Sequence, residues 1–480
     1  MSARQITRRH LLRLAGVGLA GLAAAACAPK VVEVTKVVEK VVKETVVEEK
    51  VVKETVVQVQ EKVVKETVVV EKQQPTAAPA KFDLVHWAEG HLTSTEATWQ
   101  PYVDALLNRY KELYPNVTVK LENHGWDNDL RQNLVTALLA GTGPDIICGE
   151  NYFQEYGDLG ALVPLDEYVQ DIKDNMVFAT YAAGVTKGKI YGVNQMTGLF
   201  GFARNSKVLE KAGLDPKTSP KTWDEFLEVC DKVVKAGKGN YHGYAMMGTK
   251  GWIVAGIFQL AVWMKQAGAD LCKDDCTYPF YDNPKTEEVW TFLRKLQAMT
   301  PPGMTFNPDQ GVVYGAVWKD LVAYAMDGSW SLTAVRKPEN AHITFAPFPI
   351  PKGGKDASIV VANVLNAVMT ASKHKAEAAA FCKIFQEDAV QDMLYPVFGW
   401  LPSTKSALKK LRETGTDSDK VYIDIFLNGD PGILPQWRRE AQKLWTILND
   451  LLEKVLATNE PIKGLMQKAQ QDADAVLKPA

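Results

Sequence analysis

Aromatic and hydrogen-bonding residues occur together in three short segments of the sequence. The segments are Trp-Ala-Glu-Gly-His at 87–91, Asn-His-Gly-Trp at 123–126 and Glu-Asn-Tyr at 150–152. Aromatic rings stack on the apolar C–H faces of a pyranose, while carboxylate, amide and imidazole groups pair with its hydroxyls. This mixture of residue types therefore suits a sugar or a similar small polar molecule.

The three segments follow predicted β-strands. The pattern predicts a strand at 82–87, a helix at about 102–113, a strand at 117–121, a helix at 130–140 and a strand at 145–148. This βαβαβ order is typical of an α/β fold in which helices cover a parallel sheet and ligands bind at the carboxyl ends of the strands. We therefore expect the three segments to lie at one edge of a sheet.

Composition and motifs exclude several classes of function. The chain has 480 residues, 55 Lys and Arg against 57 Asp and Glu, and a formal net charge of −2. No basic stripe is present, so we expect no nucleic-acid partner. The sequence lacks Gly-x-Ser-x-Gly, His-Glu-x-x-His, phosphate-loop and paired Cys/His motifs, which predicts no enzyme, cofactor or metal site. A glycosidase stays open as an alternative, since Glu89 and Glu150 could form a carboxylate pair.

The first 27 residues are predicted to be an export signal. Arginines without acidic residues precede an apolar run at 14–26 that is too short to span a bilayer comfortably. The segment Thr-Arg-Arg-His-Leu-Leu-Arg at 7–13 resembles a twin-arginine motif. The alanines before Cys27 resemble a lipobox, so we expect a lipid on Cys27 at the outer face of the cytoplasmic membrane, on the cell surface or in a periplasm. Cleavage by ordinary signal peptidase in the alanine run is the alternative.

Residues 28–81 are predicted to be a low-complexity stalk and linker. Residues 31–72 consist almost entirely of Val, Lys, Glu and Thr, with valine pairs about every five residues. This spacing fits neither a coiled-coil seam nor strict strand alternation, so no secondary structure is assigned. An isolated helix or a weakly associating coiled coil is the competing interpretation. The folded body should begin near Phe82.

Motifs along nearly all of residues 82–477 match one known family. They include Tyr-Pro-Asn-Val-Thr-Val at 114–119, Gly-Thr-Gly-Pro-Asp-Ile at 141–146, Gly-Ser-Trp at 328–330 and Gly-Trp-Leu-Pro at 399–402. Through these motifs the sequence resembles the family 1 extracellular solute-binding proteins of ABC importers, which are maltose-binding-protein-like. Several such pieces in order along the chain make the resemblance specific.

The resemblance implies a two-lobed, type II periplasmic-binding-protein-like fold. Each α/β lobe has a mainly parallel sheet, and the ligand lies in a cleft that closes by a hinge. Carried onto this sequence, lobe 1 is 82–194 plus 365–400 and lobe 2 is 195–364 plus 401–480. The crossings between the lobes are expected near 193–197, 360–365 and 398–402. The resemblance also implies an ABC permease as the partner and a monomeric binding protein.

The candidate ligand-binding residues come from the three loop segments and from positions near glycine or proline in the second half. They are Trp87, Glu89, His91, Trp126, Glu150, Asn151, Trp252, Trp330, Asn363 and Trp437. Trp87 taken alone is as well explained by core packing. The family often has glycine where Asn363 stands, so the Asn363 amide either contacts the ligand or caps local backbone, as does Asn194.

The cysteines of the body fall into two groups. Cys272 and Cys276 bracket a short polar turn in an exported chain, so a local disulfide worth roughly 2 kcal/mol or less is expected. The cysteines at 148, 230 and 382 lie in apolar stretches, where cysteine is usually a small buried residue.

These observations together predict an exported, lipid-anchored binding protein that delivers a carbohydrate or sugar-like solute to an ABC permease. A binding protein for a peptide or polyamine is the first alternative. A secreted glycosidase and a surface adhesin are less favoured. The best argument for an adhesin is the repetitive stalk alone.

Overall fold

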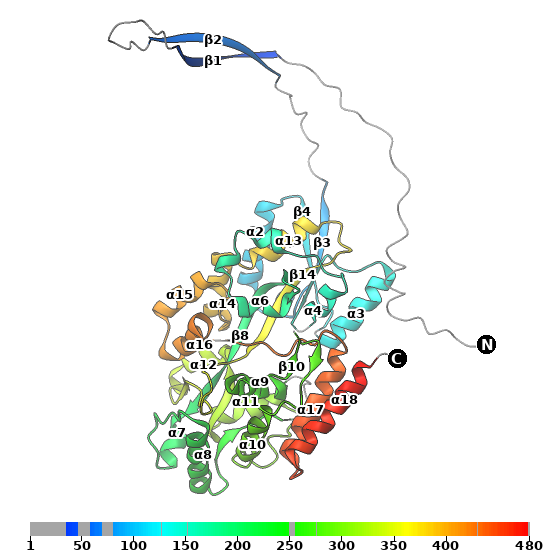
Figure 1. Cartoon of the computed structure of the whole chain (residues 1–480). Helices are drawn as coiled ribbons and strands as arrows, with labels where there is room; N and C mark the ends of the chain where they lie inside the picture. Colours follow the sequence, from blue (N-terminus) through cyan, green and yellow to red (C-terminus); the bar gives the residue numbers. More distant parts are fainter. Residues whose placement is uncertain are drawn as a thin grey trace, which may run out of the picture. The chain divides into compact units, whose positions relative to one another are not determined.

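The computed structural model describes residues 35–46, 58–69, 80–125, 127–150, 152–248, 255–274, 276–429 and 431–478. The chain divides into two compact units, Met1–Ala80 and Lys81–Ala480. Figure 1 labels the helices and strands of both units.

The first unit contains two paired strands. Strand β1 (Thr35–Val46) runs antiparallel to β2 (Gln58–Val69), with Thr35 opposite Val69 and Val46 opposite Gln58. The β-branched residues valine and threonine, which fill much of both strands, favour extended backbone. The helix or coiled coil that was the competing interpretation is therefore wrong over these residues.

A mixed sheet of eight strands organises the second unit. The order along the sheet is β4-β3-β5-β14-β8-β12-β9, and β13 also pairs with β8. The strands are β3 (Phe82–Trp87), β4 (Val117–Glu122), β5 (Ile146–Gly149), β8 (Val193–Asn205), β9 (His242–Ala245), β12 (Val322–Gly328), β13 (Ile343–Ala346) and β14 (Val360–Val368). Strand β3 is parallel to β4 and β5, and β12 is parallel to β9, whereas every antiparallel pair includes β8 or β14.

Strand β8 joins the two halves of this sheet. Its first part pairs with β14, and its second part pairs with β12 and β13. We call the half around β3, β4 and β5 lobe 1, and the half around β9, β12 and β13 lobe 2. The crossings expected at 193–197 and 360–365 fall on β8 and β14. At the third, the Leu401 backbone N–H donates to the Thr197 carbonyl at 3.2 Å.

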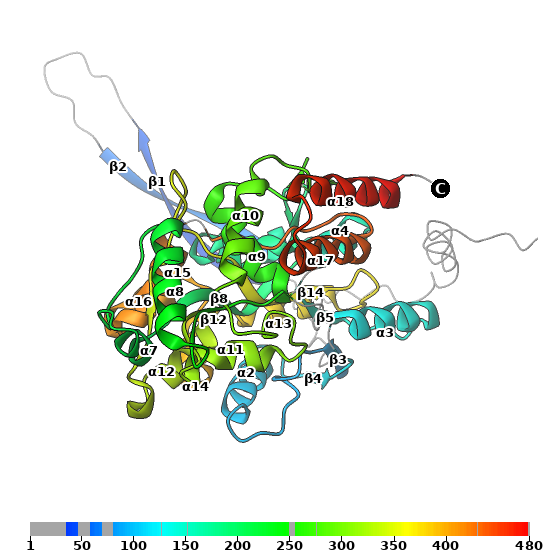
Figure 2. The same cartoon turned by 90° about the horizontal axis from the view of Figure 1, so that it is seen from below.

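Helices cover both faces of the sheet. The helices of lobe 1 and of the segment that returns to it are α2 (Gln100–Leu113), α3 (Asp127–Ala140), α4 (Phe153–Asp158), α5 (Asp166–Val169), α6 (Phe178–Tyr181), α13 (Lys375–Ile384) and α14 (Asp388–Phe398). Those of the remaining chain are α7 (Ser206–Lys211), α8 (Trp223–Gly237), α9 (Ala255–Ala267), α10 (Thr286–Gln297), α11 (Gln310–Trp318), α12 (Leu332–Val335), α15 (Lys405–Thr414), α16 (Asp417–Asn428), α17 (Ala441–Ala457) and α18 (Ile462–Leu477). Figures 1 and 2 show α17 and α18 side by side.

Short elements complete the second unit. Four 3-10 turns are η1 (Lys173–Asn175), η2 (Ala182–Gly184), η3 (Ser329–Ser331) and η4 (Pro338–Asn340). Two small hairpins are formed by β6 (Val185–Thr186) with β7 (Lys189–Ile190) and by β10 (Cys272–Lys273) with β11 (Tyr278–Pro279). Cys272 and Cys276 form a disulfide at the second hairpin.

Helix α8 illustrates how the sequence sets these elements. The Thr222 side chain caps the helix by accepting a hydrogen bond from the Glu225 backbone N–H at 3.2 Å. The buried residues Phe226, Cys230 and Val233 then recur at helical spacing, which turns one face of α8 toward the sheet.

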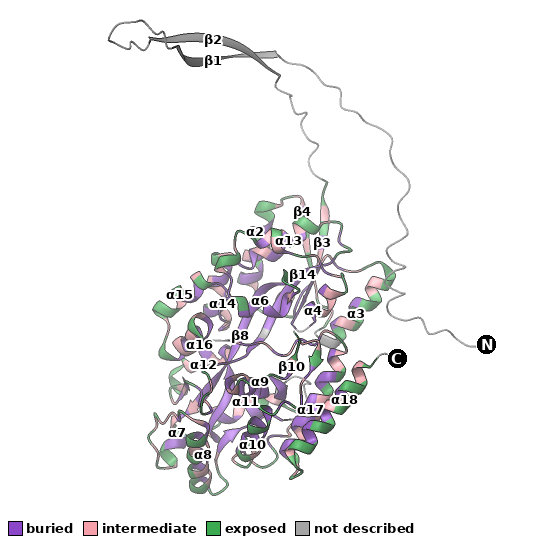
Figure 3. Ribbon diagram, in the orientation of Figure 1, coloured by how far each residue is buried: buried purple, intermediate pink, exposed green. Residues whose placement is uncertain are grey.

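The described buried residues form one cluster in lobe 1, one in lobe 2, and a third that lies mostly in lobe 2 but also contains Val177, Ala179 and Tyr395 of the lobe 1 segments. One cluster contains residues of β3, β5, α2 and α13, and two others contain residues of β12, α9, α10 and α16. Figure 3 shows the buried positions along the strands of the sheet. The cysteines at 148, 230 and 382 are buried, and so are Trp263 and Trp290. Strands β8 and β14 connect the lobes, and a few connecting residues of this kind can absorb the rotation in a hinged protein.

Candidate ligand-binding site

Five partly exposed aromatic rings belong to one connected group of rings that extends from lobe 1 to lobe 2 and also includes Phe200 and Phe398. We call them the aromatic array: His91, Trp99, Tyr314, Trp330 and Trp400. The ring centroid of His91 lies 4.0 Å from that of Trp99 and 6.4 Å from that of Trp400. The centroid of Trp330 lies 5.8 Å from that of Trp400 and 6.1 Å from that of Tyr314.

Distant parts of the chain supply these rings. His91 follows β3 and Trp99 precedes α2, whereas Tyr314 lies on α11 and Trp330 on η3, directly after β12. Trp400 follows α14, at the third crossing between the lobes. The carboxyl ends of strands from both lobes thus deliver rings to one place, as expected for an α/β binding site.

The exposure of these rings distinguishes them from core aromatics. All five are only partly buried, whereas Trp263 and Trp290 in the lobe 2 core are fully enclosed. A ring that keeps part of its surface exposed can be contacted by a ligand, but an enclosed ring cannot. The array is therefore the best candidate for a recognition surface in the described part of the chain.

Trp330 is supported by the two residues that end β12. A Cβ atom added to Gly328 would lie 2.2 Å from Cη2 of Trp330, so the indole packs directly on the bare glycine. The Asp327 carboxylate, 1% exposed, accepts hydrogen bonds from Trp318 Nε1 at 2.8 Å and from the Trp330 side chain. Burial raises the pKa of Asp327 to about 6, although these hydrogen bonds oppose the shift.

Trp400 rests against the crossing strand β8. A Cβ atom on Gly198 would lie 3.2 Å from Cζ3 of Trp400 and 3.1 Å from Oγ of Ser329. Glycine at this position therefore allows the ring and η3 to approach the backbone of β8 closely.

Glu89 does not have the role that the sequence suggested. The side chain is 3% exposed, and Oε2 accepts hydrogen bonds from the His91 backbone N at 2.6 Å and ring Nδ1 at 2.7 Å. The other oxygen, Oε1, accepts from the Leu92 backbone N at 3.0 Å and from Gln195 Nε2 at 2.9 Å. A carboxylate offers about four lone-pair positions, and all are used. The expectation that Glu89 contacts the ligand is corrected: Glu89 holds His91 and its loop.

Asn363 and Glu150 stabilise the crossing strands. Oε1 of Glu150 accepts from the Asn363 backbone N at 3.0 Å, beside a register shift in β14. Oδ1 of Asn363 accepts from Asn194 Nδ2 at 2.5 Å, and the same Nδ2 group also donates to the Thr180 carbonyl. Both asparagines are buried, and the paired atoms of their amides, Nδ2 of Asn194 and Oδ1 of Asn363, have the capping role rather than a ligand contact.

Two predicted tryptophans lie in cores, away from the array. Trp87 is 4% exposed and stacks on His124 with ring centroids 3.8 Å apart. Trp437 is 3% exposed and meets Tyr281 edge-on in the lobe 2 core. Their predicted stacking on a ligand is corrected to packing roles in this structure, because neither ring presents an open face.

Four predicted positions lie outside the described residues. They are the ligand candidates Trp126, Asn151 and Trp252 and the lipidation candidate Cys27. Of the ten ligand candidates, His91 and Trp330 belong to the array.

Three members of the array were missed among the candidate residues. Trp400 stands in the Gly-Trp-Leu-Pro motif that carried the family resemblance, and this motif was the available signal. Tyr314 follows a helical pattern and Trp99 lies just before a helix, so neither has a local pattern that separates it from packing residues.

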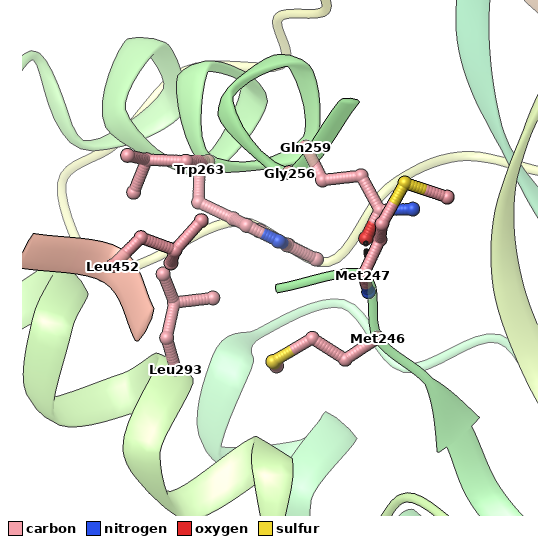
Figure 4. Close-up of a pocket in the computed structure, with 8 residues that line it drawn as sticks. Met246, Met247, Gly256, Gln259, Trp263, Leu293 and Leu452 are labelled. Carbon is pink, nitrogen blue, oxygen red and sulfur yellow. Dashed lines mark hydrogen bonds between the residues drawn. The ribbon is translucent and has the colours of Figure 1, made fainter. Parts of the chain in front are cut away.

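A small pocket in lobe 2 does not suit an oligosaccharide. Figure 4 shows it between α9, α10, α17 and the end of β9, and its empty volume is about 200 Å³. Its lining residues are Met246, Met247, Gly256, Gln259, Leu260, Trp263, Leu293 and Leu452. This lining is mostly apolar, and sugar hydroxyls need more polar partners than Gln259 and Trp263 supply.

The described residues contain neither a cluster suited to a metal ion nor a helix suited to a membrane. No group of three or more His, Cys, Asp or Glu side chains there could hold a metal ion. None of the helices described there is both long enough and apolar enough to cross a bilayer.

Proteins of known function and structure resemble this chain. An arabinooligosaccharide-binding protein of Bacillus subtilis is 26% identical over 345 residues, 69% of this chain and 76% of that protein. A lactose-binding protein of Rhizobium radiobacter is 25% identical over 311 residues, 60% of this chain and 69% of that protein.

Solved structures support the fold. The crystal structure of a cyclic alpha-maltosyl-1,6-maltose binding protein from Arthrobacter globiformis aligns with a TM-score of 0.71 at 21% identity, covering 84% of this chain and all of that one. The sugar-binding protein MalE from Xanthomonas citri aligns with a TM-score of 0.69 at 18% identity, covering 82% and 97%. The predicted two-lobed α/β fold class is confirmed. Residues 89–392 match the family model described as bacterial extracellular solute-binding protein, so the chain belongs to that family.

Proposed function

We propose that this chain is the extracellular substrate-binding component of an ABC importer and that it binds a carbohydrate across the aromatic array. The observation that carries the proposal is the connected group of partly exposed rings contributed by both lobes. Each ring that stacks on an apolar sugar face adds about 0.5–1.5 kcal/mol beyond area burial. Relatives that are named for arabinooligosaccharide and lactose support the same ligand class.

The charges beside the array favour a neutral ligand over a polyamine. A polyamine needs carboxylates that are free to pair with its ammonium groups. The carboxylates that support the array, Glu89 and Asp327, accept hydrogen bonds from protein donors instead. Sugar hydroxyls and apolar ring faces match the surface better than a row of positive charges does.

The state of Glu89 also argues against a glycosidase. A glycosidase needs two carboxyl groups that are free to protonate the leaving group and to attack or activate water. Both oxygens of Glu89 are occupied by backbone, imidazole and amide donors. The relatives are binding proteins, which agrees with a function without catalysis.

Two further parts of the proposal concern the lobes and the membrane. The lobe boundaries at 82–194 plus 365–400 and at 195–364 plus 401–480 are part of the proposal, and their support is that one buried cluster lies mainly in the first set of residues and another mainly in the second. We further propose that the chain is exported, monomeric and held at the membrane by a lipid on Cys27, supported by the alanine run before this cysteine. In this arrangement the body binds sugar outside the cell and presents it to the permease.

A ligand screen on the purified protein tests the function. Maltotriose, lactose and arabinotriose should raise the midpoint of thermal unfolding, by stabilising the native state by about 2.7 kcal/mol at one hundred times Kd. A tripeptide and spermidine should not. A shift with spermidine or the tripeptide but with no sugar would refute carbohydrate binding, as would the absence of any shift, which an adhesin predicts. Release of smaller sugars over time would indicate a glycosidase.

A pair of variants connects binding to the array. Trp400→Ala should weaken sugar binding about tenfold or more, since removal of one stacking ring costs about 1.4 kcal/mol or more. Tyr278→Ala is the matched control, because Tyr278 is an aromatic residue 52% exposed on the β10–β11 hairpin and not a member of the array. Equal affinities of both variants would contradict a role for the array.

A further inference from the structure

A chain of buried polar side chains crosses three strands and ends at the array. Nε2 of His86 on β3 pairs with Oδ1 of Asn366 on β14 at 2.8 Å. Nδ2 of Asn366 donates to Oε1 of Gln195 on β8 at 3.1 Å, and Nε2 of Gln195 donates to Oε1 of Glu89 at 2.9 Å. All four side chains are at most 3% exposed, so this chain of hydrogen bonds is enclosed.

We propose that Gln195 is a positioning residue for ligand binding, which fixes Glu89 so that the His91 ring faces the ligand with Nε2 as a hydrogen-bond acceptor. The proposal rests on the proposed function and deepens it. It adds that the ligand donates a hydroxyl hydrogen bond at His91, between Trp99 and Trp400.

The direction of the donors supports this role. Oδ1 of Asn366 can only accept, so Nε2 of His86 must carry the proton of this hydrogen bond. Burial keeps His86 neutral, because it lowers the pKa of that imidazole to about 3, although the hydrogen bond that His86 donates to Asn366 opposes the shift. Each amide then donates toward the next acceptor, and the series ends on the Glu89 carboxylate. A one-way series of this kind fixes the orientation of the Gln195 amide, with its N–H toward Glu89.

Glu89 transmits this orientation to His91. Its Oε2 atom accepts from both the backbone N and the ring Nδ1 of His91, at 2.6 and 2.7 Å. Because the Glu89 carboxylate can only accept, Nδ1 of His91 carries a proton, and in the uncharged tautomer with that proton Nε2 is an acceptor. The His91 side chain is 39% exposed and lies within contact distance of Trp99, so this acceptor is placed at the array. A sugar hydroxyl is a donor of the matching kind.

Hydrogen exchange tests the positioning without any ligand. Gln195→Met in the full chain keeps the shape of the side chain but removes the N–H that holds Glu89. The amide of Leu92, which donates to the same Glu89 oxygen, should exchange about tenfold faster, together with the amide of His91. Gln266→Met is the matched control, because Gln266 is a fully buried amide that links Trp223 to Ala357 in lobe 2. Unchanged exchange in residues 88–94, or equal loosening by both variants, would overturn the proposal.

A double-mutant cycle tests whether Gln195 acts through His91. Maltotriose is the probe, and its affinity should fall about tenfold for Gln195→Met and for His91→Phe, which keeps an aromatic ring without an acceptor. In the His91→Phe background, Gln195→Met should cause no further loss. Additive losses would overturn the proposal, because they would mean that Gln195 supports the fold in general. If maltotriose does not bind the wild type but the exchange result holds, the proposed ligand fails while the positioning of His91 stands.

Discussion

Replacing Gly328 by alanine should displace Trp330 while leaving the fold intact. The new Cβ atom would lie 2.2 Å from Cη2 and Cζ3 of the indole and 2.3 Å from Cε3. Carbon atoms in contact are about 3.5–4.0 Å apart, so the ring must move by about 1.3 Å or more, the difference between 3.5 and 2.2. Gly328 has φ −87° and ψ 164°, a conformation that alanine adopts without strain.

The structure also sets the size of the expected changes in stability and in sugar affinity. Trp330 is only partly buried, so its ring can turn outward at the cost of its edge contacts with Tyr314 and Phe200, about 0.5–1.5 kcal/mol each, and of its hydrogen bond to Asp327, about 1 kcal/mol. The loss of glycine's freedom in the unfolded chain offsets about 0.4–1 kcal/mol of this. The free energy of unfolding should therefore fall by about 1–3.5 kcal/mol, whereas sugar affinity should fall about tenfold or more because a stacking face is misplaced.

Calorimetric titration with maltotriose and urea unfolding measure these effects separately. Gly201→Ala is the contrasting variant, since its Cβ would lie 2.3 Å from Cζ and Oη of Tyr422. Tyr422 is fully buried and donates to the Asp327 carbonyl at 3.0 Å, so its ring cannot turn away. This variant should lose about 2 kcal/mol or more of stability. Sugar affinity of Gly328→Ala within twofold of wild type would refute the placement of Trp330 in the site.

Three further predictions follow from charges and crosslinks. The pKa of Asp327 is raised to about 6, which means that the folded protein favours the protonated carboxyl group. The contribution of Asp327 to stability is therefore fully present below about pH 4 and is lost as the pH rises through 6. The free energy of unfolding should fall by about 3 kcal/mol for a pKa raised by about two units. Urea unfolding between pH 4.5 and 7.5 should show this decrease with rising pH in the wild type and not in Asp327→Asn. Arg438→Gln should lower the free energy of unfolding by about 1–2 kcal/mol, because Nη1 of Arg438 lies 3.4 Å from Asp158 across the lobes and both side chains are mostly buried. Adding Asp158→Asn to this variant should lower it little further. Replacing Cys272 and Cys276 by serine should lower the thermal midpoint only slightly, because the closed loop is short.

Local patterns predicted the elements of lobe 1 closely. The strand expected at 82–87 is β3 (Phe82–Trp87), and the helix expected at about 102–113 is α2 (Gln100–Leu113). The strand expected at 117–121 is β4 (Val117–Glu122), because alternating valines and polar residues have a period that only a strand satisfies. The stalk was not predictable in this way, since its five-residue valine spacing matches neither period.

The candidate site was predicted only in part, because its contacts join residues that are far apart in sequence. His91 and Trp330 stood out by their aromatic or polar neighbours, but the contact of His91 with Trp400 depends on how α14 returns to the crossing. The exposure of a side chain, which the sequence does not show, decided which of the other candidates can contact a ligand. Trp87 has the same local surroundings as His91 in the sequence, yet its ring is enclosed by His124 while that of His91 stays partly open.

The location of Gln195 and Gly198 on β8 suggests why hinge closure and ligand binding should be coupled. Within four residues of one crossing strand, Gln195 holds the loop that carries His91, and Gly198 accommodates the Trp400 ring. Trp330 lies at the end of β12 in lobe 2, and its neighbour Ser329 contacts β8 beside Gly198. Rotation of the lobes about β8 would therefore change the distance between Trp330 and His91, which is held from lobe 1. A ligand that contacts all three rings binds best in one lobe arrangement and so favours that arrangement, as linkage requires.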